Sequence, residues 1–150
     1  MAWYLLAKWF HIFGVCGMVG TTLCNGLLHR MALQAPNAAA RQTTLSHILL
    51  LNRWVMAPSF VALIGGGLAM VSALSLPALP GWLSTSMVLT AVLVLAFIAG
   101  YGLEHRLWRL AGQPDTERRY RRVFLLAVPV GLLATVLSGV VIYLMIRKAG

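Results

Sequence analysis

Four long apolar stretches dominate this chain and leave little sequence for anything else. They cover approximately residues 3–28, 49–76, 82–103 and 123–146, and short polar or proline-containing segments separate them. A helix of about 20 apolar residues crosses the hydrocarbon core of a bilayer and satisfies its own backbone hydrogen bonds there. We therefore predict an all-α fold, in which residues 1–150 form a single membrane domain, a four-helix transmembrane bundle.

The basic residues indicate which side of the membrane each loop occupies. The chain has 12 Lys and Arg against 3 Asp and Glu, a net charge of +9. Most of the Arg residues lie in or beside the segments that join the first stretch to the second and the third to the fourth. Because cytoplasmic loops are enriched in Lys and Arg, we expect both loops inside and both termini outside a bacterial inner (plasma) membrane. Topology then explains the charge, so the expected partner is the lipid bilayer and not nucleic acid.

Polar and small residues of the first stretch recur every three or four positions, which places them on one side of a helix. This stripe consists of Lys8, His11, Gly14, Met18, Thr22, Asn25 and His29. In lipid, such a stripe must face protein or a cofactor. Helix packing is sufficient to explain Gly14, Thr22 and Asn25. It does not explain Lys8 and His11, because ionisable groups inside a span are energetically expensive.

The other three stretches have inner faces of the same kind. In the second stretch, Pro58 is expected to kink the helix, and Gly65–Gly67 remove side chains where a backbone or a flat ligand can approach. Thr43 or Thr44 is the expected N-cap of this helix, and residues 77–81 form the expected turn after it. The expected inner faces consist of Asn52, Met56, Ser59, Leu63, Gly66 and Met70 in the second stretch, Ser86, Thr90, Leu93, Phe97, Gly100 and Glu104 in the third, and a packing stripe of Gly131, Thr135 and Gly139 in the fourth.

The first candidate site is a cofactor site in the outer half of the bundle. His11 lies roughly 12 Å along its helix from the outer end, and Met70, Met87 and Met145 lie at a similar depth on the other three helices. Histidine and thioether sulfur are ligands for haem iron and for Cu(I). We predict haem b with His11 as first ligand and one of these methionines as second, and with Lys8 paired to a propionate. Ordinary packing is the alternative for the methionines.

The second candidate site lies at the cytoplasmic side. His29, His47 and His105 reach the same membrane face, near Glu104, so together with His11 they complete the candidate metal ligands of the chain. The alternative is that they are solvated near lipid headgroups. The three acidic residues lie in or beside the cytoplasmic loop. This position argues against a proton pump built on a pair of carboxylates within the bilayer.

Short motifs resemble those of known membrane families. The Lys8-x-x-His11 pair is similar to the start of HemJ-type membrane protoporphyrinogen oxidases and of CopD-like copper-resistance proteins. Arg53 followed by Pro58 and a glycine cluster resembles the second HemJ-type span, and Gly81-Trp82-Leu83 resembles the opening of the third. The resemblance implies a haem b held with His11, and it would imply tetrapyrrole oxidation.

This chain departs from the HemJ-type pattern at two places. Ser86 stands where the third-span lysine is expected, and Leu126-Ala127 replace an Asn-Glu pair before the fourth-span proline. These changes weigh against the oxidase activity but leave the haem site. A closer resemblance, over nearly the whole chain, is to a family of bacterial predicted integral membrane proteins of unassigned function. It is carried by Gly17–Gly20, Trp54 to Pro58, Trp82-Leu83 to Ser86, and Arg106–Leu110.

These observations predict a small, cytochrome b-like membrane protein in electron transport, acting with a quinone or a redox protein. It would work alone or as a subunit of a larger redox complex, as a homo- or hetero-oligomer. The alternatives are a cofactor-free accessory or assembly subunit, and a copper-handling membrane protein. The sequence shows none of the soluble-enzyme motifs considered, including phosphate loops and nucleophile elbows. We therefore do not expect an enzyme, unless it is an oxidoreductase subunit.

Overall fold

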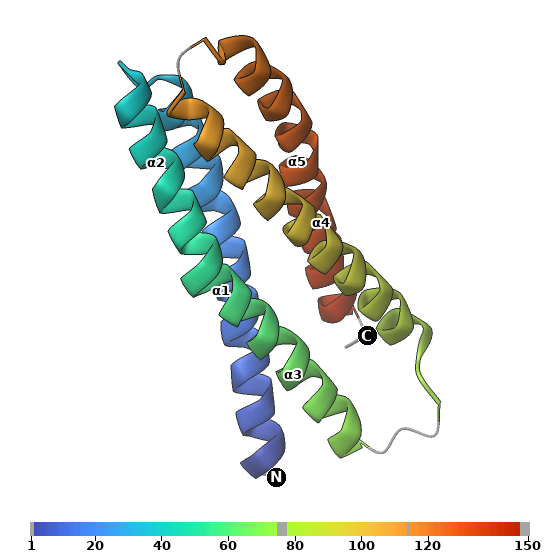
Figure 1. Ribbon diagram of the computed structural model, residues 1–150. Coiled ribbons are helices and arrows are strands. Elements are labelled where there is room, and N and C mark those ends of the chain that lie inside the picture. The colour runs from blue at the N-terminus through green and yellow to red at the C-terminus, as the bar shows by residue number, and fades with distance from the viewer. Residues whose placement is uncertain (1, 75–77, 114, 148–150) are drawn as a thin grey trace.

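The computed structural model describes residues 2–74, 78–113 and 115–147, and all regular structure within these ranges is helical. The elements are α1 (Ala2–Leu33), α2 (Ala38–Leu51), the π-helix η1 (Asn52–Met56), α3 (Ala57–Leu74), α4 (Gly81–Ala111) and α5 (Glu117–Arg147). Because α2, η1 and α3 follow one another without a break, they form a single rod (Figure 1). The four rods are long and apolar enough to cross a membrane. The predicted all-α fold of four membrane-spanning helices is confirmed.

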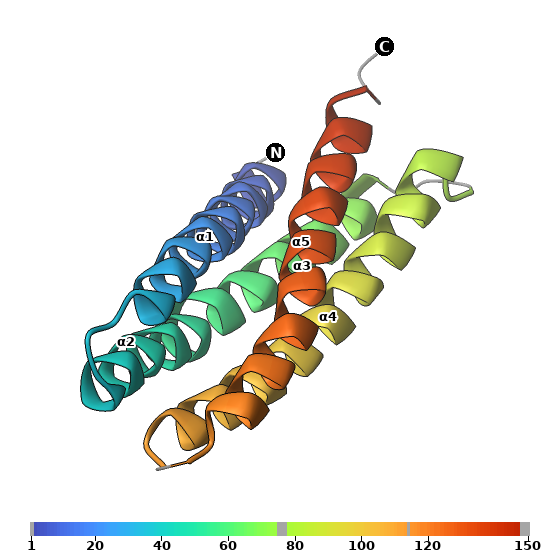
Figure 2. The same ribbon diagram turned by 90° about the horizontal axis from the view of Figure 1, so that it is seen from above.

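The rods are arranged as two closely packed pairs that meet along α2 and α4. α1 packs along α3, α4 packs along α5, and α2 bridges α1 and α4, whereas α1 and α5 contact each other only sparsely. Figure 2 shows α1 and α5 as separate rods when the bundle is seen from above. The start of α1, the end of α5 and the start of α4 lie at one end of the bundle, and the α1–α2 and α4–α5 connections lie at the other (Figure 1).

The helices extend beyond the predicted membrane spans at the end that carries the basic loops. α2 begins at Ala38, and its N-cap is Asn37, whose side chain accepts a hydrogen bond of 2.8 Å from the Ala40 N–H. The expectation that Thr43 or Thr44 caps this helix is wrong, because both lie inside α2 and donate their hydroxyls to carbonyls one turn earlier. The predicted end of the second span at residue 76, and residue 77 of the predicted turn, lie outside the described residues.

A π-helical turn lies directly before Pro58 in the second span. The Ala57 N–H donates to the Asn52 carbonyl, five residues earlier, which is the hydrogen bond of a π-helix. Pro58 follows immediately. Proline has no N–H to donate, and its ring crowds the carbonyl four residues before it. The wider turn absorbs this disturbance and adds one residue to the helical repeat.

Glycines bring the backbones of α1 and α3 into direct contact. A Cβ atom on Gly14 would lie 2.6 Å from the Ser59 carbonyl oxygen, and one on Gly66 would lie 2.7 Å from the His11 backbone nitrogen. No side chain fits at either position, so this pair of helices depends on both glycines. The expectation that the triple glycine admits another backbone is confirmed at Gly66.

The predicted inner faces of the second and third spans are correct, and that of the first span is correct apart from Lys8, which is exposed. Five of the six residues predicted for the second span are buried, namely Asn52, Met56, Ser59, Leu63 and Gly66. On α5 the predicted packing stripe is wrong within the described chain. Gly131, Thr135 and Gly139 are exposed, and a Cβ on either glycine would meet none of the described residues within 4 Å. The sparse contact between α1 and α5 leaves this face of α5 without a neighbouring helix.

Candidate functional site

The structure brings the predicted haem ligands together in one cavity. A cavity of about 240 Å³ lies in the half of the bundle that contains the start of α1, and residues from all four rods line it. We name it the terminal cavity. His11, Met70, Met87 and Met145 are all among its lining residues. The sequence had placed these four side chains at a common depth, and the fold places them around a common space.

His11 is oriented by a hydrogen bond to the neighbouring helix. Its Nδ1 atom lies 2.7 Å from the Leu63 carbonyl oxygen. A carbonyl can only accept, so Nδ1 carries the hydrogen and donates it, and Nε2 is the nitrogen that remains for a ligand. A Cβ on Gly67 would lie 3.2 Å from His11 Nδ1, so the absence of a side chain there leaves room for the ring. Metal-binding histidines commonly donate their second ring nitrogen to a carbonyl in this way.

Lys8 lies apart from this cavity. Its side chain is exposed and is not among the lining residues. Lys8 precedes Gly14 by six residues, or about 600° of helical rotation. Lys8 therefore points about 120° away from Gly14, which faces α3. A lysine at this position can extend its ammonium group to the membrane surface. The polar stripe of α1 therefore faces the bundle from His11 onward.

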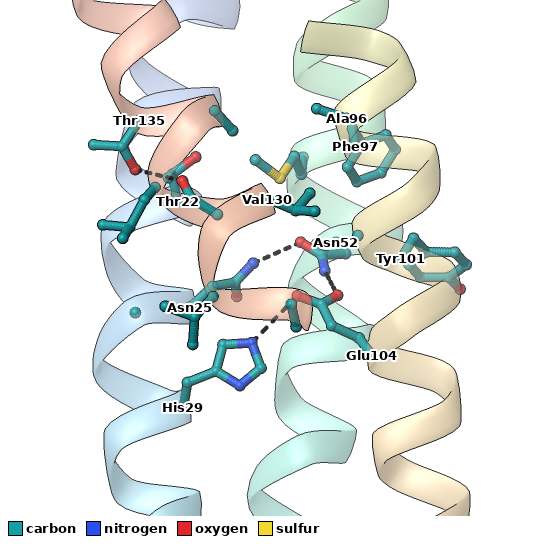
Figure 3. Close-up of a pocket in the computed structure, with 18 of the residues that line it drawn as sticks. Thr22, Asn25, His29, Asn52, Ala96, Phe97, Tyr101, Glu104, Val130 and Thr135 are labelled. Atoms are coloured by element: carbon teal, nitrogen blue, oxygen red, sulfur yellow. Dashed lines mark hydrogen bonds and ion pairs between the residues drawn. The ribbon is translucent and has the colours of Figure 1, made fainter. Parts of the chain in front are cut away.

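A second polar site, formed by three helices, occupies the half of the bundle near the basic loops. Asn25 of α1 donates from Nδ2 to Asn52 Oδ1 at 2.7 Å, and Asn52 of η1 donates from Nδ2 to Glu104 of α4. His29 Nε2 lies 3.4 Å from the other carboxylate oxygen of Glu104. Figure 3 shows these four side chains in a continuous chain of contacts. Asn52 is 2% exposed, and Asn25 and Glu104 are each 9% exposed, so the network is buried.

The network contains two polar atoms that point to a missing partner. Within the described part of the chain, neither Asn25 Oδ1 nor His29 Nδ1 has a hydrogen-bond partner, although both atoms are buried. Buried polar atoms are nearly always paired, with protein, water or a ligand. Both residues line a cavity of about 370 Å³, which we name the loop-side cavity. Its polar end is the network, and the rest of its wall is largely apolar.

The predicted histidine cluster is only partly assembled. His29 pairs with Glu104, but His47 is exposed on α2, and the ring of His105 packs edge-on against Tyr101 and Trp108. Among the described residues, no three His, Cys, Asp or Glu side chains converge closely enough to hold a metal ion.

The amides are the part of this site that sequence reasoning missed. Asn25 and Asn52 had been placed on inner faces, as packing residues, and Glu104 had been placed near the histidines. A signal was present in the sequence: two amides and one carboxylate on three inner faces must find partners in lipid. Their pairing depends on the axial offset between helices and on the π-turn at Asn52.

Four apolar rods with two cavities between them define a multi-pass integral membrane protein, for which the lipid bilayer is the solvent. The chain belongs to the family described as "Predicted integral membrane protein (DUF2269)", whose model matches residues 5–149. This confirms the predicted membership in a family of predicted integral membrane proteins. No curated protein and no solved structure matches the chain. The HemJ-type and CopD-like resemblances therefore contribute only to the proposal that follows.

Proposed function

We propose that this protein binds haem b in the terminal cavity and transfers electrons in the bacterial inner membrane, alone or as a subunit of a redox complex. A membrane quinone or a redox protein is the proposed electron partner. The observation that carries the proposal is the hydrogen bonding and location of His11. Its Nδ1–H is held by the Leu63 carbonyl, and it lines the same cavity as three methionines. Histidine and methionine are the axial pair of many electron-transfer haem proteins.

Each residue of the site has a distinct part in this proposal. His11 supplies the first ligand from Nε2, and one of Met70, Met87 and Met145 supplies the second. Bound haem would supply an iron that changes oxidation state by one electron. The hydrogen bond to Leu63 fixes the imidazole and makes it a stronger donor. We assign Lys8, which is exposed and lies outside the cavity lining, to a propionate that extends beyond the cavity.

The proposal is tested by the absorption spectrum of the purified protein. Expressed with excess haem precursor and purified in detergent, the wild type should show a Soret band that shifts on reduction. His11→Ala should abolish the band, because the first ligand is lost. His47→Ala, which changes an exposed histidine on α2, should keep it. A colourless wild type under these conditions, or a Soret band that survives His11→Ala, would contradict the proposal.

The second ligand is identified by three single variants. Met70→Leu, Met87→Leu and Met145→Leu conserve volume and remove sulfur, so their packing cost is small. The variant that loses the ligand should alter the reduced spectrum and lower the midpoint potential, because a methionine ligand raises it. The other two variants should leave both unchanged.

Two other functions have some structural support. The donors of the terminal cavity also suit Cu(I), and copper content with a featureless Soret region would favour copper handling. The exposed face of α5, with open space at Gly131 and Gly139, supports a cofactor-free accessory subunit that packs against a larger membrane complex. In that case His11→Ala would change neither absorbance nor metal content, and Gly139→Leu would disrupt assembly.

A further inference from the structure

The loop-side cavity is a separate site with its own chemistry. Four members of the central apolar cluster, Met18, Met56, Phe60 and Leu93, line it, and the fifth, Leu63, lines the terminal cavity. The cluster therefore separates the two spaces. α1 and α5, which meet only sparsely, contribute facing walls to the loop-side cavity. A molecule dissolved in the bilayer can reach it along this seam.

The polar end of the cavity calls for a ligand that donates hydrogen bonds. Asn25 uses its amide N–H on Asn52, and its Oδ1 atom is left as a buried acceptor without a partner among the described residues. Asn52 links this amide to the Glu104 carboxylate, whose two oxygens contact Asn52 and His29 (Figure 3). Arg30 also lines the cavity, but it is exposed. A phosphate headgroup at the buried network would bring a second negative charge against Glu104, so it is a poor candidate there. A hydroxyl group is a good candidate, because its one O–H can donate to either an amide or a carboxylate oxygen.

The remaining walls call for a flat, apolar body attached to that hydroxyl. Phe97, Tyr101 and Phe124 line the cavity together with aliphatic and small residues. Aromatic rings pack well against other rings. Gly131 also lines the cavity, and a Cβ there would meet none of the described residues within 4 Å, so space is open at this wall.

We propose that the loop-side cavity binds the reduced headgroup of a membrane quinone, a quinol, with a ring hydroxyl donating to Asn25 Oδ1 beside the His29–Glu104 pair. The choice of a quinol among hydroxylated lipids rests on the proposed electron-transfer function. The oxidised quinone presents only carbonyl acceptors. It cannot donate to Asn25 Oδ1 or Glu104, so the site should favour the reduced form.

Binding is measured with the fluorescent quinol-site probe heptyl-hydroxyquinoline N-oxide on detergent-purified protein. Its fluorescence should be quenched saturably by the wild type. Under anaerobic conditions decyl-ubiquinol should displace it at roughly tenfold lower concentration than decyl-ubiquinone, a difference of about one hydrogen bond. Equal displacement by the two forms overturns the preference for the reduced headgroup and with it the proposal.

Two matched glycine variants test the location. Gly131→Leu places a side chain in the cavity, where no packed residue must move. It should weaken probe binding at least roughly tenfold. Gly139→Leu, on the same helix, also enters open space, but Gly139 is not among the lining residues. It should leave binding unchanged. If the two variants weaken probe binding equally, the probe does not bind in this cavity.

Asn25→Leu tests the proposed acceptor and should weaken binding by a similar factor, roughly tenfold. His11→Ala separates this inference from the proposed function, because it changes only the terminal cavity. If His11→Ala loses the Soret band but still binds the probe, and Gly131→Leu weakens that binding, the quinol site is supported independently of the haem site. If the wild type binds haem but does not quench the probe, the proposed function stands and the quinol site is contradicted.

Discussion

Asn52 is the residue that joins the three helices of the buried network. It accepts a hydrogen bond from Asn25 and donates one to Glu104. Asn52→Leu would leave Asn25 Nδ2 and one oxygen of Glu104 without partners, while His29 still contacts the other oxygen. Buried polar atoms without partners cost about 1–3 kcal/mol each. We expect the free energy of unfolding to fall by at least about 2 kcal/mol, measured by denaturant titration in mixed micelles with far-UV circular dichroism.

The control for this prediction is Thr43→Val. Thr43 is exposed on α2 and donates its hydroxyl only to a carbonyl of its own helix. The free energy of unfolding should therefore change by less than about 0.5 kcal/mol. Wild-type stability in Asn52→Leu would show that the amides are dispensable for folding.

Single residues also show where sequence reasoning succeeds. The three- and four-residue spacing placed His11, Asn25 and Asn52 on inner faces, because helical geometry fixes direction within a helix. It misplaced Lys8, because steps of three residues drift around the helix by about 60° each. It could not pair Asn52 with Glu104, because contact between helices depends on their axial offset.

At the scale of the helix, Gly66 sets the distance between α1 and α3. A Cβ there would lie 2.6 Å from the Ala7 carbonyl oxygen. Gly66→Ala must push the helices apart, and overpacking of this kind costs about 1–3 kcal/mol. Gly65→Ala is the matched control, because a Cβ on Gly65 meets none of the described residues within 4 Å. It should raise stability by up to about 1 kcal/mol through helix propensity.

Thermal unfolding in detergent distinguishes these neighbours. The midpoint temperature should fall for Gly66→Ala and stay or rise for Gly65→Ala. The opposite order would mean that α1 and α3 do not touch at this glycine. Because Gly66 meets the His11 backbone, we also expect its variant to disturb the ring that Leu63 holds.

The π-turn marks the limit of pattern analysis for whole elements. Pro58 predicted a disturbance in the second span, but its form depends on local backbone geometry that spacing does not encode. The structure widens one turn over Asn52–Met56 and adds a residue. The α5 stripe shows a second limit. Small residues at four-residue spacing predict packing, but only the assembled bundle shows that no helix of the described chain covers Gly131 and Gly139.

For the molecule as a whole, the charge pattern predicts one orientation in the membrane. Cys16→Ala and Cys24→Ala, both at exposed sites, give a cysteine-free background. In it, Leu79→Cys and Gln113→Cys place single thiols on exposed residues just before and just after α4, which runs the length of the bundle. The arginine-rich end should face the cytoplasm. A membrane-impermeant maleimide should therefore label Leu79→Cys in intact cells and Gln113→Cys only after permeabilisation.

This orientation determines which side of the membrane each cavity is closer to. With the loops inside, the terminal cavity and His11 lie in the outer half of the bilayer, and Glu104 and His29 lie in the half next to the cytoplasm. A quinol oxidised in the loop-side cavity would then release its protons in the half next to the cytoplasm, and its electrons would pass one at a time to the proposed haem in the outer half. The reverse labelling pattern would exchange these sides, and labelling of both thiols in intact cells would indicate that the chain inserts in both directions.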